Sequence, residues 1–216
     1  EFAAAGGTPL SSPAEVAEKS DFIVSCLPSP EALDEVIAGP RGVMDTIRGG
    51  QIFLELGTYP LAVKERQRAR LAEKNATFID GEISGTPVMV ANRKSSVFLA
   101  GDQAACEKTA EVVKGFTDAC TYFGAFGASI QVKLIANLLV SIHIAAAGEA
   151  MAIGLRTGID PKVLIGAIIS GAGASAQFGA RAGMMAESSP VPQGAPLTLA
   201  YTGAGLTMIE TGPGFV

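Results

Sequence analysis

Short apolar runs alternate with longer amphipathic stretches along the first half of the chain. The runs are rich in Val, Ile, Leu and Phe and are bounded by turn residues, a pattern that is typical of strands. The expected strands are 22–27, 52–56, 77–80, 97–100 and 120–123, and the expected helices between them are 12–19, 30–37, 60–74 and 103–115. Strands that alternate with helices in this way predict a parallel sheet with crossover helices.

The pattern changes near Gly127, after which the apolar positions follow only a helical period. Helices are expected at 130–154, 161–170 and 174–187, whereas the Pro- and Gly-rich tail from 188 has no clear period. The chain is therefore expected to hold an α/β domain at 1–126 and an all-α domain at 127–216.

The long helix expected at 130–154 carries Lys133 and Asn137 four residues apart among Leu, Ile, Val and Ala. Positions i and i+4 lie on one helix face, and burying a charge without a partner is costly. The pair is therefore the first candidate for chemistry, although a lysine at the start of a core helix can also simply extend to solvent. The single histidine, His143, is rotated away from the Lys133 direction and is expected to pack within the helix.

Composition narrows the function classes. The 216 residues are 48% hydrophobic and 17% charged with a net charge of −5, which favours a packed α/β enzyme over a nucleic-acid-binding protein. The scattered cysteines fit a reducing cytoplasm. The three cysteines lack CxxC spacing, so buried thiols are expected and a metal site is not. The apolar run 134–147 is shorter than the roughly 20 residues that span a bilayer, so membrane contact is not expected.

Four segments occur in the order and spacing of one enzyme family. They are Leu27-Pro28 after an apolar strand, Leu56-Gly57-Thr58-Tyr59-Pro60, Asp80-Gly81-Glu82-Ile83-Ser84-Gly85-Thr86, and Gly127 followed by Lys133 and Asn137. The third is similar to an Asp-Ala-Pro-Val-Ser-Gly loop. The fourth is similar to Gly-x-Gly-x-x-x-Lys-x-x-Asn-Asn, with Ser129 and Ala136 in place of the second Gly and the first Asn. The chain thus resembles the β-hydroxyacid dehydrogenases, which include 3-hydroxyisobutyrate, tartronate semialdehyde and sugar-acid dehydrogenases.

The resemblance implies a Rossmann-like first domain, NAD or NADP as cofactor, a small hydroxy acid as substrate, and a homodimer or homotetramer paired through the helical domain. Lys133 would be the general acid/base, since a lysine desolvated beside a cofactor can exchange a proton near working pH. The implied cofactor-binding residues are Leu27, Pro28 and Thr58, and the implied substrate-binding residues are Ser84, Gly85, Thr86 and Asn137.

Ordinary structural roles are open for the same residues. Thr58 is also placed to cap the following helix, and Ser84-Gly85 is also compatible with a simple turn after a strand. Replacing Gly85 by Val is expected to block a substrate carboxylate while leaving the fold intact.

Two features of the family pattern are missing. No Gly-x-Gly-x-x-Gly turn precedes Asp21, and Gly171-Ala172-Gly173 follows an expected helix rather than a strand. The nearest match to the family's C-terminal Lys-Asp pair is Thr202-Gly203. We expect that segments are missing at both ends and that these 216 residues bind dinucleotide weakly.

A non-catalytic remnant or interaction domain of the same fold is the alternative function. Ala136 argues against a 6-phosphogluconate dehydrogenase, which would show Lys-x-x-His-Asn, and Lys133 argues against an imine reductase.

Overall fold

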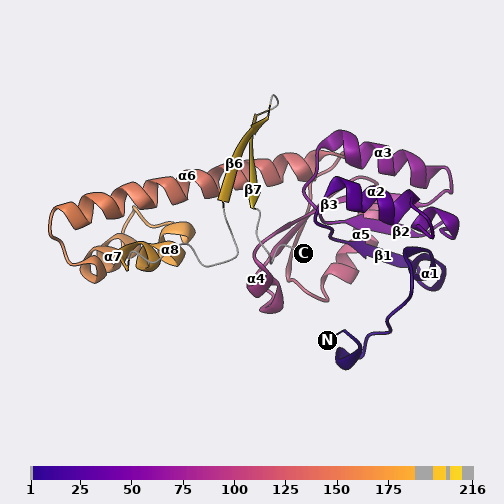
Figure 1. The fold of residues 1–216 in the computed structure, drawn as a ribbon, viewed down its shortest axis with the longest axis horizontal. Helices are drawn as coiled ribbons and strands as arrows, with labels where there is room; N and C mark the ends of the chain where they lie inside the picture. The colour runs from indigo at the N-terminus through magenta and orange to yellow at the C-terminus, as the bar shows by residue number, and fades with distance from the viewer. Residues whose placement is uncertain (1, 188–196, 203–204, 211–216) are drawn as a thin grey trace. The chain divides into compact units, whose positions relative to one another are not determined.

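The computed structural model describes residues 2–187, 197–202 and 205–210, and Figure 1 shows their fold. The chain divides between Lys133 and Leu134 into two compact units. The first contains η1 (Ala3–Ala5), α1 (Pro13–Lys19), β1 (Phe22–Ser25), α2 (Pro30–Ala38), η2 (Val43–Asp45), β2 (Ile52–Glu55), α3 (Leu61–Ala72), β3 (Thr77–Ser84), α4 (Pro87–Ala91), β4 (Ser96–Ala100), α5 (Gln103–Val113), β5 (Ala119–Tyr122) and the start of α6 (Ala128–Arg156). The expected strands and crossover helices are present. The C-terminal extension of β3 and the short helix α4 were not expected.

The sheet has the strand order β1-β2-β3-β4-β5. It is parallel-dominated, as predicted, with one exception: β4 runs antiparallel to β3. The connection between these two strands contains only the short α4. A parallel crossover needs a dozen or more residues, so this segment instead returns the chain in the opposite direction.

Helices cover both faces of the sheet and give the first unit three layers (Figure 1). On one face, Ile23, Phe53 and Phe78 pack with residues of α1, α2 and α3. On the other face, Leu54 and Val97 belong to a second cluster, which includes residues of α5. A sheet buried on both faces is what near-continuous apolar strands require.

Serine followed by proline begins both α1 and α2. The Ser12 hydroxyl accepts from the Glu15 N–H, and the Ser29 hydroxyl accepts from the Ala32 N–H, each at 3.2 Å. Serine satisfies a free N–H at a helix start, and proline in the first turn sacrifices no helical hydrogen bond. Because Ser29 caps α2, this helix begins only a few residues after the carboxyl end of β1.

The second unit contains the rest of α6, α7 (Pro161–Ile169), α8 (Ala176–Ala186) and an antiparallel hairpin of β6 (Leu197–Thr202) and β7 (Gly205–Glu210). Ala147 and Met151 of α6 form a core with Phe178 and Ala182 of α8. The predicted helical character is confirmed for α6 to α8, whereas the hairpin was not predicted because its sequence has no clear period. Of the weak match Thr202-Gly203, Gly203 lies outside the described residues.

Helix α6 is long and strongly apolar. With 29 residues it is long and apolar enough to cross a membrane by length and composition alone, so helix length no longer argues against a span. Several large apolar side chains on it are exposed: Leu134, Ile135, Leu138, Leu139, Ile142, Ile153 and Leu155.

Candidate active site

Polar side chains line up at the carboxyl ends of β1, β2 and β3. Ser25, Glu55 and Asp80 occupy paired positions in the three parallel strands, so their side chains lie on one face of the sheet. Glu82 lies two residues further along β3 and shares that face. Glu55, Asp80 and Glu82 have no exposure to solvent, and carboxylates are almost never buried in this way without partners.

Lys64 of α3 is the partner of two of these carboxylates. Its ammonium donates to Asp80 Oδ1 at 2.9 Å, to the Gly81 carbonyl at 2.8 Å and to Glu82 Oε1 at 2.6 Å. Three acceptors satisfy the three N–H groups of an ammonium. Burial acts to lower the pKa of Lys64, but the charges of Glu82 and Asp80 outweigh it and raise the pKa. Lys64 is therefore a fully buried cation.

Thr58 lies in the loop after β2 and is bound by Glu82, one of the two carboxylates that Lys64 contacts. Its hydroxyl donates to Glu82 Oε2 at 2.5 Å. It does not cap α3, because Pro60 occupies the N-cap position. The neighbouring Tyr59 donates to the Leu27 carbonyl at 2.5 Å. This bond joins the Thr58 loop to the loop with half-buried Leu27 and exposed Pro28, so the structure brings the three predicted cofactor residues to one edge of the sheet.

Asp80 ties the start of α6 to the same edge. Its Oδ2 accepts from the Gly127 N–H at 3.1 Å, and its backbone carbonyl accepts from the Ser129 hydroxyl at 2.8 Å. Gly127 has a φ of 94°, a conformation that favours glycine. Further along the helix, the half-buried Lys133 donates from its ammonium to the Ile83 carbonyl. Lys133 therefore lies at the end of β3, next to the predicted substrate loop.

The predicted substrate loop is also a structural joint. Ser84 ends β3 and pairs with Ser96, while Thr86 begins α4 and its hydroxyl accepts from the Met89 N–H at 3.3 Å. Gly85 has a φ of 152°, and a Cβ there would lie 3.0 Å from the Ser95 Cβ. A side chain at position 85 is therefore strained, so valine there would disturb the end of β3 as well as block a carboxylate.

Asn137 lies in the second unit, one helical turn after Lys133. It is half-buried, and its backbone carbonyl accepts from the Ser141 hydroxyl at 2.9 Å. Because α6 is continuous through both residues, Lys133 and Asn137 share a helix face.

Glu55 is the buried acid that Lys64 does not contact. Burial raises its pKa to about 7, partly offset by the Ser25 hydroxyl and by the Gly57 N–H, which donates to Glu55 Oε1 at 2.6 Å. Within the described residues, neither Ser25 Oγ nor Glu55 Oε2 has a hydrogen bond of ordinary geometry. A Cβ on Gly57 would lie 2.7 Å from Oε1, so glycine is required for this close approach.

Sequence reasoning missed Lys64, Glu55 and Glu82. A signal for two of them was present, because Asp80 and Glu82 alternate within an apolar strand and alternation puts both charges on one buried face. Two buried carboxylates require a cation. Lys64 supplies it from α3, the helix that contacts β3. No comparable signal marks Glu55.

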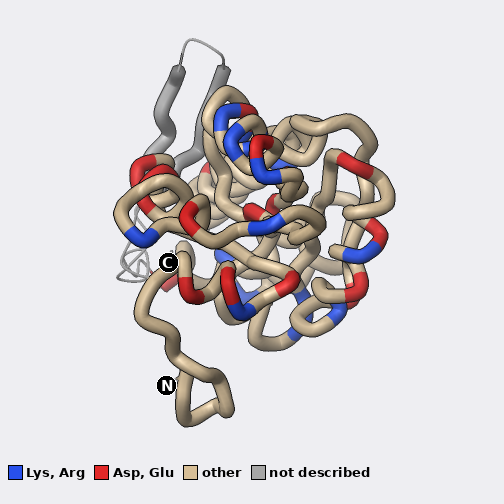
Figure 2. The backbone as a smooth tube through the Cα atoms, turned by 90° about the vertical axis from the view of Figure 1, so that its right-hand side faces the viewer, with Lys and Arg blue, Asp and Glu red and all other residues tan. Residues whose placement is uncertain are grey.

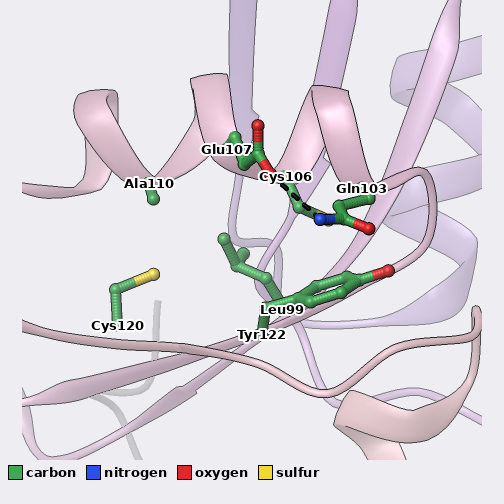
Figure 3. Close-up of a pocket in the computed structure, with 7 residues that line it drawn as sticks. All are labelled: Leu99, Gln103, Cys106, Glu107, Ala110, Cys120 and Tyr122. Carbon is green, nitrogen blue, oxygen red and sulfur yellow. Dashed lines mark hydrogen bonds between the residues drawn. The ribbon is translucent and has the colours of Figure 1, made fainter.

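Other features of the first unit lie away from this edge. A shallow cavity of about 200 Å³ lies beside α5, with Leu99, Cys106, Cys120 and Tyr122 in its lining (Figure 3). The expectation of buried thiols holds for Cys106 but is wrong for Cys26, which is exposed. Acidic and basic residues are interspersed along the backbone (Figure 2). Among residues 2–187, no cluster of His, Cys, Asp or Glu suits a metal ion.

Two family models match the segments that form this edge. Residues 1–124 match the NAD-binding domain of 6-phosphogluconate dehydrogenase, and residues 127–207 match the NAD-binding region of NADP-dependent 3-hydroxyisobutyrate dehydrogenase. The chain belongs to the β-hydroxyacid dehydrogenase family. Since both models describe NAD-binding regions, NAD or NADP is confirmed as the cofactor class of this family.

Individual members of the family agree. L-Threonate dehydrogenase from Cupriavidus necator is 33% identical over 178 residues, which cover 82% of this chain and 60% of that enzyme. Mitochondrial 3-hydroxyisobutyrate dehydrogenase from Mus musculus is 30% identical over 164 residues, covering 76% of this chain and 49% of that enzyme. The crystal structure of a 3-hydroxyisobutyrate dehydrogenase from Salmonella typhimurium matches with a TM-score of 0.73 at 28% identity, over 85% of this chain and 64% of that one. The chain thus spans about half to two thirds of the length of these relatives.

The residues at the strand edge fit a bound dinucleotide. Ligands of open α/β sheets bind outside the carboxyl ends of the strands, where Leu27, Pro28 and Thr58 lie. Thr58 is exposed, and its oxygen keeps accepting capacity after donating to Glu82. The fit does not extend to the pyrophosphate, since the printed sequence has no glycine-rich turn after a strand.

Proposed function

We propose that the chain is part of an NAD(P)-dependent dehydrogenase that oxidises a hydroxyl group of a small hydroxy acid. The observation that supports this most is the position of Lys133. Its ammonium binds the Ile83 carbonyl at the end of β3, and Glu82 of the same strand binds Thr58 in the predicted cofactor loop. Lys133 and the Thr58 loop thus meet at one strand end, which is the arrangement that the proposed roles of base and cofactor loop need.

In the proposed reaction, neutral Lys133 takes the proton of the substrate hydroxyl as that carbon loses a hydride. Bound nicotinamide would accept the hydride. The Ser84 hydroxyl and the Gly85 N–H would bind the substrate carboxylate, and the Asn137 carboxamide would donate to the oxygen that becomes a carbonyl. The proton on Lys133 then passes to solvent, which leaves a carbonyl acid and the reduced cofactor.

The relatives suggest which substrates to try first. They are named for L-threonate, 3-hydroxyisobutyrate and 2-(hydroxymethyl)glutarate. We infer that this chain acts on an acid of this class, with a hydroxyl close to a carboxylate. Turnover of these three acids with NAD⁺ and NADP⁺ is measured by the absorbance of the reduced cofactor.

The decisive test of the mechanism replaces Lys133. Lys133→Ala lowers kcat by roughly 10²- to 10⁴-fold, the usual range for a lost general acid/base, with little change in cofactor affinity or Tm. Lys133→Arg fails as well, because arginine stays protonated. Lys162→Ala, at an exposed lysine of α7, is the control and keeps full activity.

Two outcomes contradict the proposal. Near-normal turnover in Lys133→Ala or Lys133→Arg would remove Lys133 from the chemistry. Absence of both turnover and dinucleotide binding in the complete enzyme would instead support the non-catalytic interaction domain of the same fold.

A further inference from the structure

The buried ammonium of Lys64 connects two parts of the proposed site. One carboxylate that it binds, Glu82, also holds Thr58, and the other, Asp80, also holds the start of α6. We propose that Lys64 is a positioning residue that fixes the Thr58 loop and the Lys133 helix in one geometry. The role of this coupling in catalysis rests on the function proposed above, but the coupling of the Thr58 loop to the Lys133 helix through Lys64 does not.

The first connection runs through Glu82, and both of its oxygens are engaged. Oε1 accepts from Lys64 at 2.6 Å and Oε2 accepts from Thr58 at 2.5 Å. The loop that this segment resembles has proline at the same position, so the carboxylate is a departure of this chain. With Lys64 holding one oxygen, the other has a fixed direction and sets the rotamer of the Thr58 hydroxyl.

The second connection runs through Asp80, whose two oxygens are also engaged. Oδ1 accepts from Lys64 at 2.9 Å and Oδ2 accepts from the Gly127 N–H at 3.1 Å. That N–H immediately precedes α6, the helix that carries Lys133. Rotation of the Asp80 carboxylate would therefore remove one of the two hydrogen bonds by which Asp80 holds the start of this helix.

A purely stabilising ion pair is a weaker explanation of this arrangement. A buried pair often contributes little net stability compared with well-packed apolar residues of the same volume. The Lys64 ammonium, however, sets the orientation of two carboxylates whose remaining oxygens both point to groups of the site. Without the cation, Asp80 and Glu82 would lie side by side in a fully buried position, and like charges there would force protonation or separation.

Hydrogen–deuterium exchange followed by mass spectrometry tests the coupling without any ligand. Glu82→Gln keeps the Lys64–Asp80 pair, so exchange rises by roughly tenfold or more in the peptide with residues 57–59 and stays unchanged at 127–133. Asp80→Asn gives the reverse pattern, and Lys64→Met raises exchange in both peptides. The matched control is Lys74→Met, at an exposed lysine just after α3, and it changes neither peptide.

The result of this experiment decides the proposal even if Lys64→Met does not fold, because the two carboxylate variants keep a buried cation. The coupling is supported if Glu82→Gln raises exchange only at 57–59 and Asp80→Asn raises it only at 127–133. The proposal is overturned if both variants raise exchange equally in both peptides, or if neither variant raises it. Loss of a purely stabilising ion pair would not separate the two peptides.

Kinetics then connect the coupling to function. In the active protein, Glu82→Gln raises the KM for the cofactor by roughly fivefold or more, and Asp80→Asn mainly lowers kcat, because one variant frees Thr58 and the other frees the Lys133 helix. The opposite split, or equal effects on both parameters, would overturn the positioning role. If the complete enzyme neither binds dinucleotide nor turns over its substrate, the proposed function fails, while the exchange pattern still decides the coupling.

Discussion

Thr58 has a single hydroxyl hydrogen, and Glu82 accepts it. The Thr58 oxygen can then only accept from a ligand, such as the carboxamide N–H of nicotinamide. We predict that Thr58→Val weakens NADH or NADPH binding by roughly fivefold to tenfold, the range for one hydrogen bond, while Thr58→Ser preserves it. Fluorescence titration measures this affinity. The 3-acetylpyridine analogue, which has a methyl ketone in place of the carboxamide, should not distinguish the three proteins.

Glu55 makes the stability of the fold depend on pH. Its pKa is raised from 4.5 to about 7 in the folded state, so the unfolded chain loses this proton first as pH rises. The free energy of unfolding therefore falls between about pH 4.5 and pH 7, by up to roughly 3 kcal/mol. Glu55→Gln should reduce this decline in urea titrations across that range, leaving the smaller part that comes from Glu82, whose pKa is also raised by burial. Glu35→Gln, at an exposed residue of α2, should keep it, and an equal slope in Glu55→Gln would contradict the assignment.

At the scale of elements, the end of β3 depends on Gly85. We predict that Gly85→Ala lowers the free energy of unfolding by roughly 1–3 kcal/mol, because a side chain is strained at its φ of 152° and its Cβ approaches Ser95. Gly148→Ala gives the opposite sign. That glycine lies inside α6 with no atom within 4 Å of an added Cβ, and alanine is the better helix former. Chemical denaturation measures both variants, and an unchanged stability for Gly85→Ala would show that β3 relaxes around a side chain.

The elements also show how far the sequence could be interpreted. Strands β1 and β2 and helices α1 to α3 could be located from apolar runs and caps, since their signals are local. The antiparallel direction of β4 depends on the length of the connection after Ser84. The local sequence pattern does not show where β3 ends, so it does not give this length. The Thr58 hydroxyl is a similar case: its position was also compatible with a helix cap, and the acceptor that it binds instead, Glu82, is 24 residues away.

The candidate site divides in the same way. Lys133 and Asn137 stood out because polar residues in an apolar helix are conspicuous in the sequence itself. Glu55 and Lys64 did not, because their importance comes from burial beside other strands. In the sequence, Lys64 looks like the other charged residues of α3 until its burial is known.

At the scale of the whole molecule, α6 offers a surface for self-association. Ile135, Leu138, Leu139 and Ile142 are 44–60% exposed on this helix, and contiguous apolar patches typically mark interfaces. We predict a dimer or tetramer that Leu139→Glu with Ile142→Glu converts to monomers. Light scattering coupled to size-exclusion chromatography gives the mass. Val112→Glu on α5, also at an exposed apolar residue, is the control.

Three results would decide between the uses of this helix. A monomer at every concentration in the unmodified protein would refute self-association. Retention with lipid vesicles after flotation would favour a membrane role for α6. A stable oligomer that the double variant leaves intact would place the interface elsewhere.

The three-way contact of Lys64 has a consequence for the evolution of the family. Glu82 adds a second buried carboxylate beside Asp80, and neither charge is tolerable there without the ammonium. Relatives with an acidic residue at position 82 should therefore carry lysine at position 64, and those with proline at 82 should be free to vary at 64. The two positions should change together between branches, so that exchanging one alone between relatives yields a poorly folded protein and exchanging both restores it.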